Sequence, residues 1–180
     1  MPITDLTGLI ARRILLNYQV EPHIAARILP QPFRPKLVDG KAIAGICLIR
    51  LERIRPKGLP SFAGLSSENS AHRMAVEWTD AEGNENQGVF VFRRDSDSAL
   101  NALLGGRWFP GVHYHSLFSV DDRWDSVRLR VDADDFPDPL VELDVEQGSG
   151  LPHGSVFPTL EHASGFFQAG CLGYSLSADG

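Results

Sequence analysis

The sequence has no apolar run long enough to cross a membrane, and it contains only two cysteines. A membrane-spanning helix needs about 20 predominantly apolar residues. Residues 1–20 include Asp5 and lack the basic start, apolar centre and small-residue cleavage site of a secretory leader. Cys47 and Cys171 do not form a metal-binding spacing, so we expect two small buried hydrophobic residues. These absences predict a cytoplasmic protein without a membrane partner.

Positive charge is also scarce, because 17 Lys and Arg stand against 23 Asp and Glu, for a net charge of −6. Residues 1–60 carry ten basic and four acidic residues (+6), whereas residues 61–180 carry seven and nineteen (−12). Nucleic-acid binders present a basic face and a high isoelectric point, so we expect no nucleic-acid partner. One basic cluster, Arg50, Arg53, Arg55 and Lys57, indicates either a solvated strand end or a site for a small anion.

The sequence does contain a series of short strand patterns separated by turn signals. Asp39-Gly40 between two apolar runs is a strong hairpin signal, because both turn residues must accept positive φ. Strands are predicted at 13–20, 41–53, 71–79, 87–93, 112–120, 124–131, 140–145 and 172–176. Short helices are predicted at 22–29, 96–104 (capped by Asp95 or Ser96) and 159–169. Because hairpins predominate, we predict a single α+β domain over residues 1–180, with a mainly antiparallel curved sheet or partial barrel.

Five segments together resemble a known family. They are LNYQVEPHIAARILPQPF, VDGKAIAGICLIRLERIRP, SSENSAHRMAVEW, GVFVFRRDSDSALNALLGGRWFPGVHYHS and FFQAGCLGYS. Over residues 10–176 the chain resembles the uncharacterised YqjF-like family of the acetoacetate decarboxylase-like superfamily. This resemblance implies an antiparallel, partly closed β structure around an internal cavity, with a few short helices.

The resemblance also implies where catalysis would take place. In acetoacetate decarboxylases a buried lysine forms a Schiff base with a β-keto acid, and a neighbouring lysine lowers its pKa. The matching positions here are Gly111 and Val112, neither of which can form an imine. The chain's three lysines, Lys36, Lys41 and Lys57, lie beside turns or in a Pro/Gly-rich loop, and we expect all three to be exposed. We therefore predict no Schiff-base decarboxylation.

Other positions implied by the resemblance differ to varying degrees. Gln19 stands where the decarboxylases carry an arginine, so a carboxylate-binding cation is missing there. Glu68 matches their glutamate, unless the alignment shifts to Glu77. Arg107 and Trp108 fall at the implied cavity wall, where Arg107 could either bind a carboxylate or face the carbonyls of a helix end.

Two pairs of side chains could carry chemistry. Glu68 and His72 are four residues apart, and an even spacing on a strand puts both on one face. There the carboxylate could orient the imidazole for acid–base catalysis. His113 and His115 also share a face, and with His72 or Glu68 as a third ligand they could hold a metal ion. The alternatives are buried polar pairs, exposed ion pairs and cavity-lining histidines, and we expect no resident metal or other cofactor.

Three functions remain open at this stage. The first is binding of a small apolar or carboxylated metabolite in an internal cavity lined by Gln19, Arg107, Trp108, His113 and His115. The second is an enzyme with altered, His/Glu-based or metal-assisted chemistry. The third is a structural or partner-binding domain whose barrel is filled by side chains. A homodimer is a further expectation, because a strand near residue 176 would otherwise leave a sheet edge uncovered.

Overall fold

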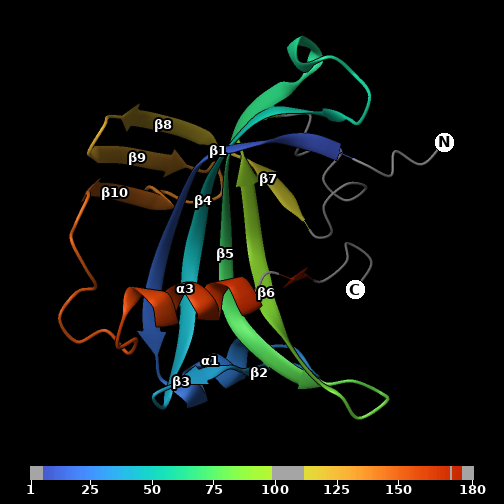
Figure 1. The fold of residues 1–180 in the computed structure, drawn as a ribbon, viewed down its shortest axis with the longest axis vertical. Helices are drawn as coiled ribbons and strands as arrows, with labels where there is room; N and C mark the ends of the chain where they lie inside the picture. The colour runs from blue at the N-terminus through green and yellow to red at the C-terminus, as the bar shows by residue number, and fades with distance from the viewer. Residues whose placement is uncertain (1–5, 99–111, 171, 176–180) are drawn as a thin grey trace.

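A computed structural model describes residues 6–98, 112–170 and 172–175 of the chain. Its main feature is a curved sheet of eight strands, shown in Figure 1. Four long antiparallel strands form its centre: β1 (Leu6–Val20), β4 (Lys41–Pro56), β5 (Leu65–Thr79) and β6 (Glu85–Ser96). Four short strands extend it: β2 (Arg34–Pro35), β3 (Leu37–Val38), β7 (His113–His115) and β11 (Gly173–Tyr174). A second, antiparallel sheet contains β8 (Leu117–Asp122), β9 (Ser126–Asp132) and β10 (Val141–Glu146).

Different elements cover the two faces of the central sheet. The helical elements of the described ranges are α1 (Pro22–Ile28), the 3-10 turn η1 (Ser61–Ala63) and α3 (Leu160–Ala169). One face, which we call the core face, packs against α1 and the second sheet through residues such as Leu48 and Met74. The opposite face, which we call the α3 face, includes Ile43 and Ala75 and lies beneath α3 (Figure 1).

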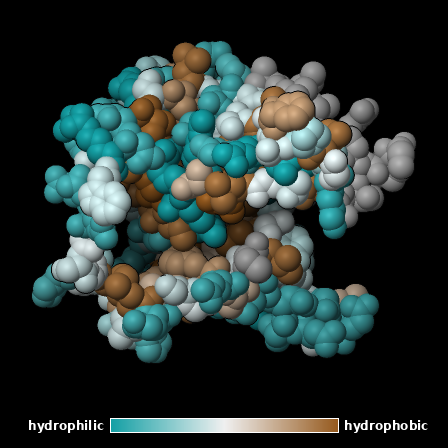
Figure 2. Space-filling view, turned by 45° about the horizontal axis from the view of Figure 1, so that its top comes forward, coloured by the Kyte–Doolittle hydropathy of each residue, from teal (hydrophilic) through white to brown (hydrophobic). Residues whose placement is uncertain are grey.

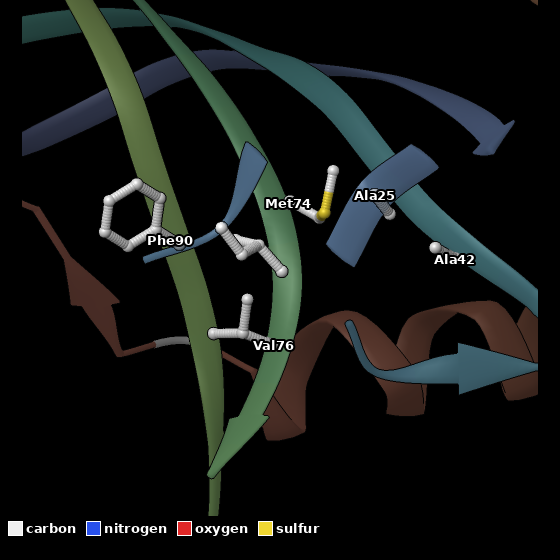
Figure 3. Close-up of a cluster of buried hydrophobic side chains, with 6 residues drawn as sticks. Ala25, Ala42, Met74, Val76 and Phe90 are labelled. Atoms are coloured by element: carbon white, nitrogen blue, oxygen red, sulfur yellow. The ribbon is translucent and has the colours of Figure 1, made fainter. Parts of the chain in front are cut away.

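Two hydrophobic clusters stabilise the core face. The first joins Ala25 of α1 to Ala42, Met74, Val76 and Phe90 of the sheet (Figure 3). The second joins Leu48 of β4 to buried residues of the small sheet, which are Leu129, Val131 and Val141. Each large apolar side chain buried in this way contributes about 1.5–3 kcal/mol. Strand β4 is therefore buried along much of its length, as the two apolar faces of its sequence predict.

The mainly antiparallel α+β architecture is confirmed, and so are several local signals. Asp39 and Gly40 adopt φ of 47° and 73° in the turn between β3 and β4. Helix α1 begins at Pro22 and α3 ends at Ala169, as predicted. In addition, Thr159 caps α3 by accepting a hydrogen bond from the His162 backbone N–H. Two pairings are parallel, β6 with β7 and β6 with β11. No helix within the described ranges is long and apolar enough to cross a membrane.

Two predicted elements differ from the structure. The predicted strand 112–120 is divided at Ser116, which is 2% exposed and donates its backbone N–H to Ser96 O at 3.0 Å. This anchor places β7 in the central sheet and β8 in the second sheet. The predicted helix at 96–104 is wrong at its start, because Ser96 ends β6 and residues 97–98 are not helical. Its remaining residues, 99–104, lie outside the described ranges.

Candidate functional site

Strand alternation divides the polar side chains of β5 between the two faces of the central sheet. Glu68 and His72 alternate with Ser70 and Met74 on the core face, whereas Arg73 points to the α3 face. The two faces therefore carry different polar side chains, and residues that are adjacent in sequence, such as His72 and Arg73, have different neighbours.

Glu68 lies at the rim of the core face in an ion-pair network. Its carboxylate is 2.6 Å from Arg12 Nη2 and 3.6 Å from Arg50 Nη1, and Arg12 Nη1 also lies 2.6 Å from Asp122 Oδ2. Burial raises the pKa of Glu68, although both arginines oppose that shift. The network borders an open hollow of about 440 Å³. Because each carboxylate oxygen faces an arginine, Glu68 links β1, β4 and β5 and is not aligned with an imidazole.

His72 shares the core face with Glu68, as the spacing predicts, but no hydrogen bond or ion pair joins the two. In register His72 lies between Ile46 of β4 and Arg93 of β6. Its Nε2 is buried and has no hydrogen-bond partner in the described part of the chain. Burial lowers the pKa of His72, while Asp95 opposes that shift and Arg93 adds to it. Burial therefore favours the neutral form of the imidazole, and the Glu68 carboxylate does not orient it.

Asp95, expected as a helix cap, is instead the centre of a buried network. It is 1% exposed, and its carboxylate accepts hydrogen bonds from Ser116 Oγ at 2.9 Å and Ser70 Oγ at 3.3 Å. Arg93 Nη2 lies 2.8 Å from Asp95 Oδ1, and the same guanidinium lies over Tyr114, 4.1 Å from the ring centroid. With its oxygens satisfied, Asp95 joins β5, β6 and the β7–β8 junction and is not free to bind a ligand.

His113 and His115 lie on the edge strand β7, paired in register with Arg94 and Ser96 of β6. This register puts both residues on the α3 side of the sheet, so His72 and Glu68 lie across the sheet from them. No group of three or more His, Cys, Asp or Glu able to hold a metal ion occurs within residues 6–98, 112–170 and 172–175.

The α3 face holds a buried guanidinium that sequence reasoning missed. Arg73 is 9% exposed, and its Nη2 is buried without a hydrogen-bond partner among the described residues. Its Cζ lies 5.8 Å from the ring centroid of Phe167 on α3, a weak cation–π contact. Burial lowers the pKa of Arg73, with Cys47 opposing and Arg13 adding to that shift. Over the same described ranges no carboxylate forms an ion pair with this guanidinium.

Two spaces that share part of their lining lie next to α3. Arg73 borders a hollow of about 10 Å³, which is the size of one water molecule. A larger cavity of about 330 Å³ adjoins it, and both are lined by Asn17, Ile43 and Phe167. The larger cavity lies between β1, α3 and the segment 151–157, and most of its lining is hydrophobic. Seen from the α3 side in Figure 2, the molecule is hollowed across its middle, with hydrophobic side chains in the depression.

Gln19 is the predicted ligand-binding residue that lines this cavity. Its Nε2 donates a hydrogen bond of 2.8 Å to the Gly154 carbonyl oxygen, so it also ties β1 to the segment 151–157. Arg107 and Trp108 lie outside the described residues. The larger cavity thus includes one of the predicted ligand-binding residues, Gln19. Arg73, which lines the adjoining hollow, was not predicted.

None of the chain's three lysines occupies Gly111 or Val112, the positions that match the lysine pair of the decarboxylases. Gly111 is outside the described residues, and Val112 is 49% exposed beside a separate hollow of about 370 Å³. Lys57 is exposed as predicted, but the expectation of full exposure is wrong for Lys36 and Lys41, which are partly buried. Lys41 pairs with Glu21. Lys36 bonds to Gln87 and lies over the Phe166 ring, 4.7 Å from its centroid, because α3 covers it.

Known proteins resemble this chain in sequence family and in fold. Residues 10–162 match the model of the DUF2071 family, described as an uncharacterized conserved protein. A search of the curated proteins finds no match. Among solved structures, an acetoacetate decarboxylase from Legionella pneumophila subsp. pneumophila str. Philadelphia 1 is similar, with a TM-score of 0.52 and 15% identity. The match covers 80% of this chain and 51% of that one, so this chain spans about half the decarboxylase's length and shares its fold.

Proposed function

The chain belongs to the DUF2071 family of uncharacterised conserved proteins, and we propose that it binds a small carboxylate with an apolar body between α3 and the central sheet. The observation that carries this proposal is the buried guanidinium of Arg73, whose Nη2 lacks a partner among the described residues. An unpaired buried charge costs several kcal/mol. A bound carboxylate would supply the missing acceptor through a charge-assisted hydrogen bond.

The charge of the lining favours an anion. Arg73 and Lys36 both border the small hollow, and neither Asp nor Glu is among the described residues that line this hollow or the adjoining cavity. Acidic residues outnumber basic ones by 23 to 17 in the whole chain, so composition alone does not explain an acid-free lining. A cation would find no carboxylate ligand there, whereas an anion would find the guanidinium.

The shape of the larger cavity indicates what the rest of the ligand is like. Its volume of about 330 Å³ is near the lower end of small-molecule sites, which span roughly 300–1,000 Å³. Ile43, Phe157 and Phe167 supply apolar walls, while Asn17 and Gln19 supply amide groups. Arg73 borders only the small hollow, so a carboxylate that reaches it must widen this hollow, and the ligand's acyl chain or aromatic ring would then lie against these walls. The ligand we propose is therefore a short acyl or aromatic carboxylate, not a sugar or a nucleotide.

We propose that the protein binds the carboxylate without forming an imine with it. The resemblance to decarboxylases places their lysine pair at Gly111 and Val112, neither of which carries an amine. Lys36, which lines the hollow beside Arg73, has its amine bonded to Gln87. The activity in the name of the similar solved structure is therefore not carried over to this chain.

Calorimetric titration with butanoate, hexanoate, octanoate and benzoate tests the proposal, with the corresponding alcohols as neutral probes. We expect saturable one-to-one binding of at least one of these carboxylates and no binding of the alcohols. Arg73→Met should weaken that binding by roughly 10- to 100-fold, because a hydrogen bond to a charged group contributes about 1.5–3 kcal/mol.

Two further variants sharpen the test. Arg128→Met is the matched control, because Arg128 lies on β9, is exposed and pairs with Asp144, so its loss should leave binding unchanged. Arg73→Lys keeps the charge and should retain part of the affinity. Wild-type affinity in Arg73→Met, or no binding of any carboxylate to the unmodified protein, would show that the proposal is wrong.

A further inference from the structure

The hairpin between β4 and β5 ends in a basic and apolar segment that the proposed ligand site does not use. We call residues 53–65 the hairpin tip. It carries Arg53, Arg55 and Lys57 and contains no Asp or Glu, although the chain as a whole is acidic. Its large apolar side chains are exposed: Leu59 is 49% exposed and Phe62 is 88% exposed. The tip therefore combines positive charge with hydrophobic surface.

This exposure belongs to a folded segment. Arg55 donates from Nε to the Leu59 carbonyl and from Nη1 to the Arg53 carbonyl, each at 2.8 Å. The 3-10 turn η1 carries Phe62 at its centre. The chain also packs closely on itself, because a Cβ added to Gly64 would lie 2.5 Å from the Arg53 backbone. These contacts hold Phe62 outward instead of folding it onto the core.

Apolar side chains beside the tip are exposed as well. Leu9 and Ile10 of β1 pair with residues 52 and 51 of β4 and are 53% and 54% exposed. In Figure 1 the hairpin tip projects beyond the end of the central sheet, away from α3. A projecting surface of this kind can make contact without a pocket, because its side chains can insert into the surface of a partner.

We propose that the hairpin tip is a reversible contact for an anionic phospholipid surface. Lys and Arg are attracted to anionic headgroups, and Phe and Leu side chains gain from burial at the acyl boundary. Charge complementarity favours this partner at the tip alone, because the tip carries three cations and no Asp or Glu, whereas the rest of the acidic chain is repelled by anionic headgroups. This proposal departs from the sequence expectation of no membrane partner, which rested on the absence of a spanning segment and of a leader. This proposal is independent of the carboxylate site.

The test is co-sedimentation of the full chain with vesicles of phosphatidylcholine alone and with phosphatidylserine at about 2:1. We expect binding only when phosphatidylserine is present, and release of the protein at high salt. Phe62→Ser should weaken binding by about ten-fold or more, and Lys57→Ala by about five-fold. Both residues are exposed, so neither change should unfold the protein.

Trp124→Ser is the matched control. Trp124 is 99% exposed, but it lies in the β8–β9 turn beside Asp122 and Asp125, so its loss should leave vesicle binding unchanged. The proposal is overturned if no vesicle binds, if phosphatidylcholine alone binds equally well, or if Phe62→Ser binds like the unmodified protein. Binding to an acidic polymer such as heparin without vesicle binding would assign the tip to a macromolecular anion and overturn the lipid proposal.

Discussion

His72 and Arg73 are neighbours on β5, and each has a buried nitrogen without a hydrogen-bond partner among the described residues. They point to opposite faces of the sheet, and their physical situations differ. His72 can become neutral, which removes most of the cost of its burial. An arginine keeps its charge in proteins, so Arg73 needs an acceptor, and an anion would compensate both its charge and its free N–H groups. The chemistry of the side chain therefore decides which of the two indicates a ligand.

The pH dependence of stability tests the environment of His72. Burial lowers its pKa in the folded protein below the ordinary value near 6.5. When the pH falls from about 7 toward 5, the unfolded chain therefore takes up a proton at His72 before the folded chain does, and the free energy of unfolding falls. We expect His72→Gln to show a shallower fall over this range in urea unfolding. Equal slopes in His72→Gln and the unmodified protein would contradict this account.

At the scale of elements, the sequence predicted those turns and helix starts that are determined by neighbouring residues. The Asp39-Gly40 turn and the start of α1 at Pro22 each depend on residues within one turn of the chain. The division of the predicted strand 112–120 at Ser116 depends on Asp95, which is 21 residues away. A strand pattern that is read over a few consecutive residues cannot reveal a contact between residues so far apart in the sequence.

Gly45 tests the close packing of β1 on β4 beside the proposed site. A Cβ at this position would lie 2.1 Å from the Leu16 carbonyl oxygen, so the two strands would have to separate. We expect Gly45→Ala to lower the free energy of unfolding by about 1–3 kcal/mol, in the range of other overpacking changes. Gly148→Ala is the control, because nothing lies within 4 Å of its added Cβ. Equal urea midpoints for both variants would show that the strands adjust without cost.

At the scale of the whole molecule, the sequence was sufficient for the fold class but not for the site. The sequence directs attention to side chains that can transfer protons or bind metals, which are Glu68, His72 and the histidines of β7. Arg73 was missed because a lone arginine in a strand is usually exposed. One signal was available: Ala71 and Ala75, the neighbours that share its face of the strand, are apolar. In the structure the residues that face it in register, Gly45 and Val91, also carry no charge. That α3 closes over this face could be learned only from the assembled fold.

The measurement that tests the central claim most directly is the native mass of the protein after incubation with the best-binding carboxylate, compared with its denatured mass. The account predicts one bound carboxylate per chain in the native spectrum, lost on denaturation. It predicts little or no adduct in Arg73→Met under the same conditions. Equal occupancy in the two proteins, or no adduct in either, would contradict the claim that Arg73 anchors an anionic ligand beneath α3.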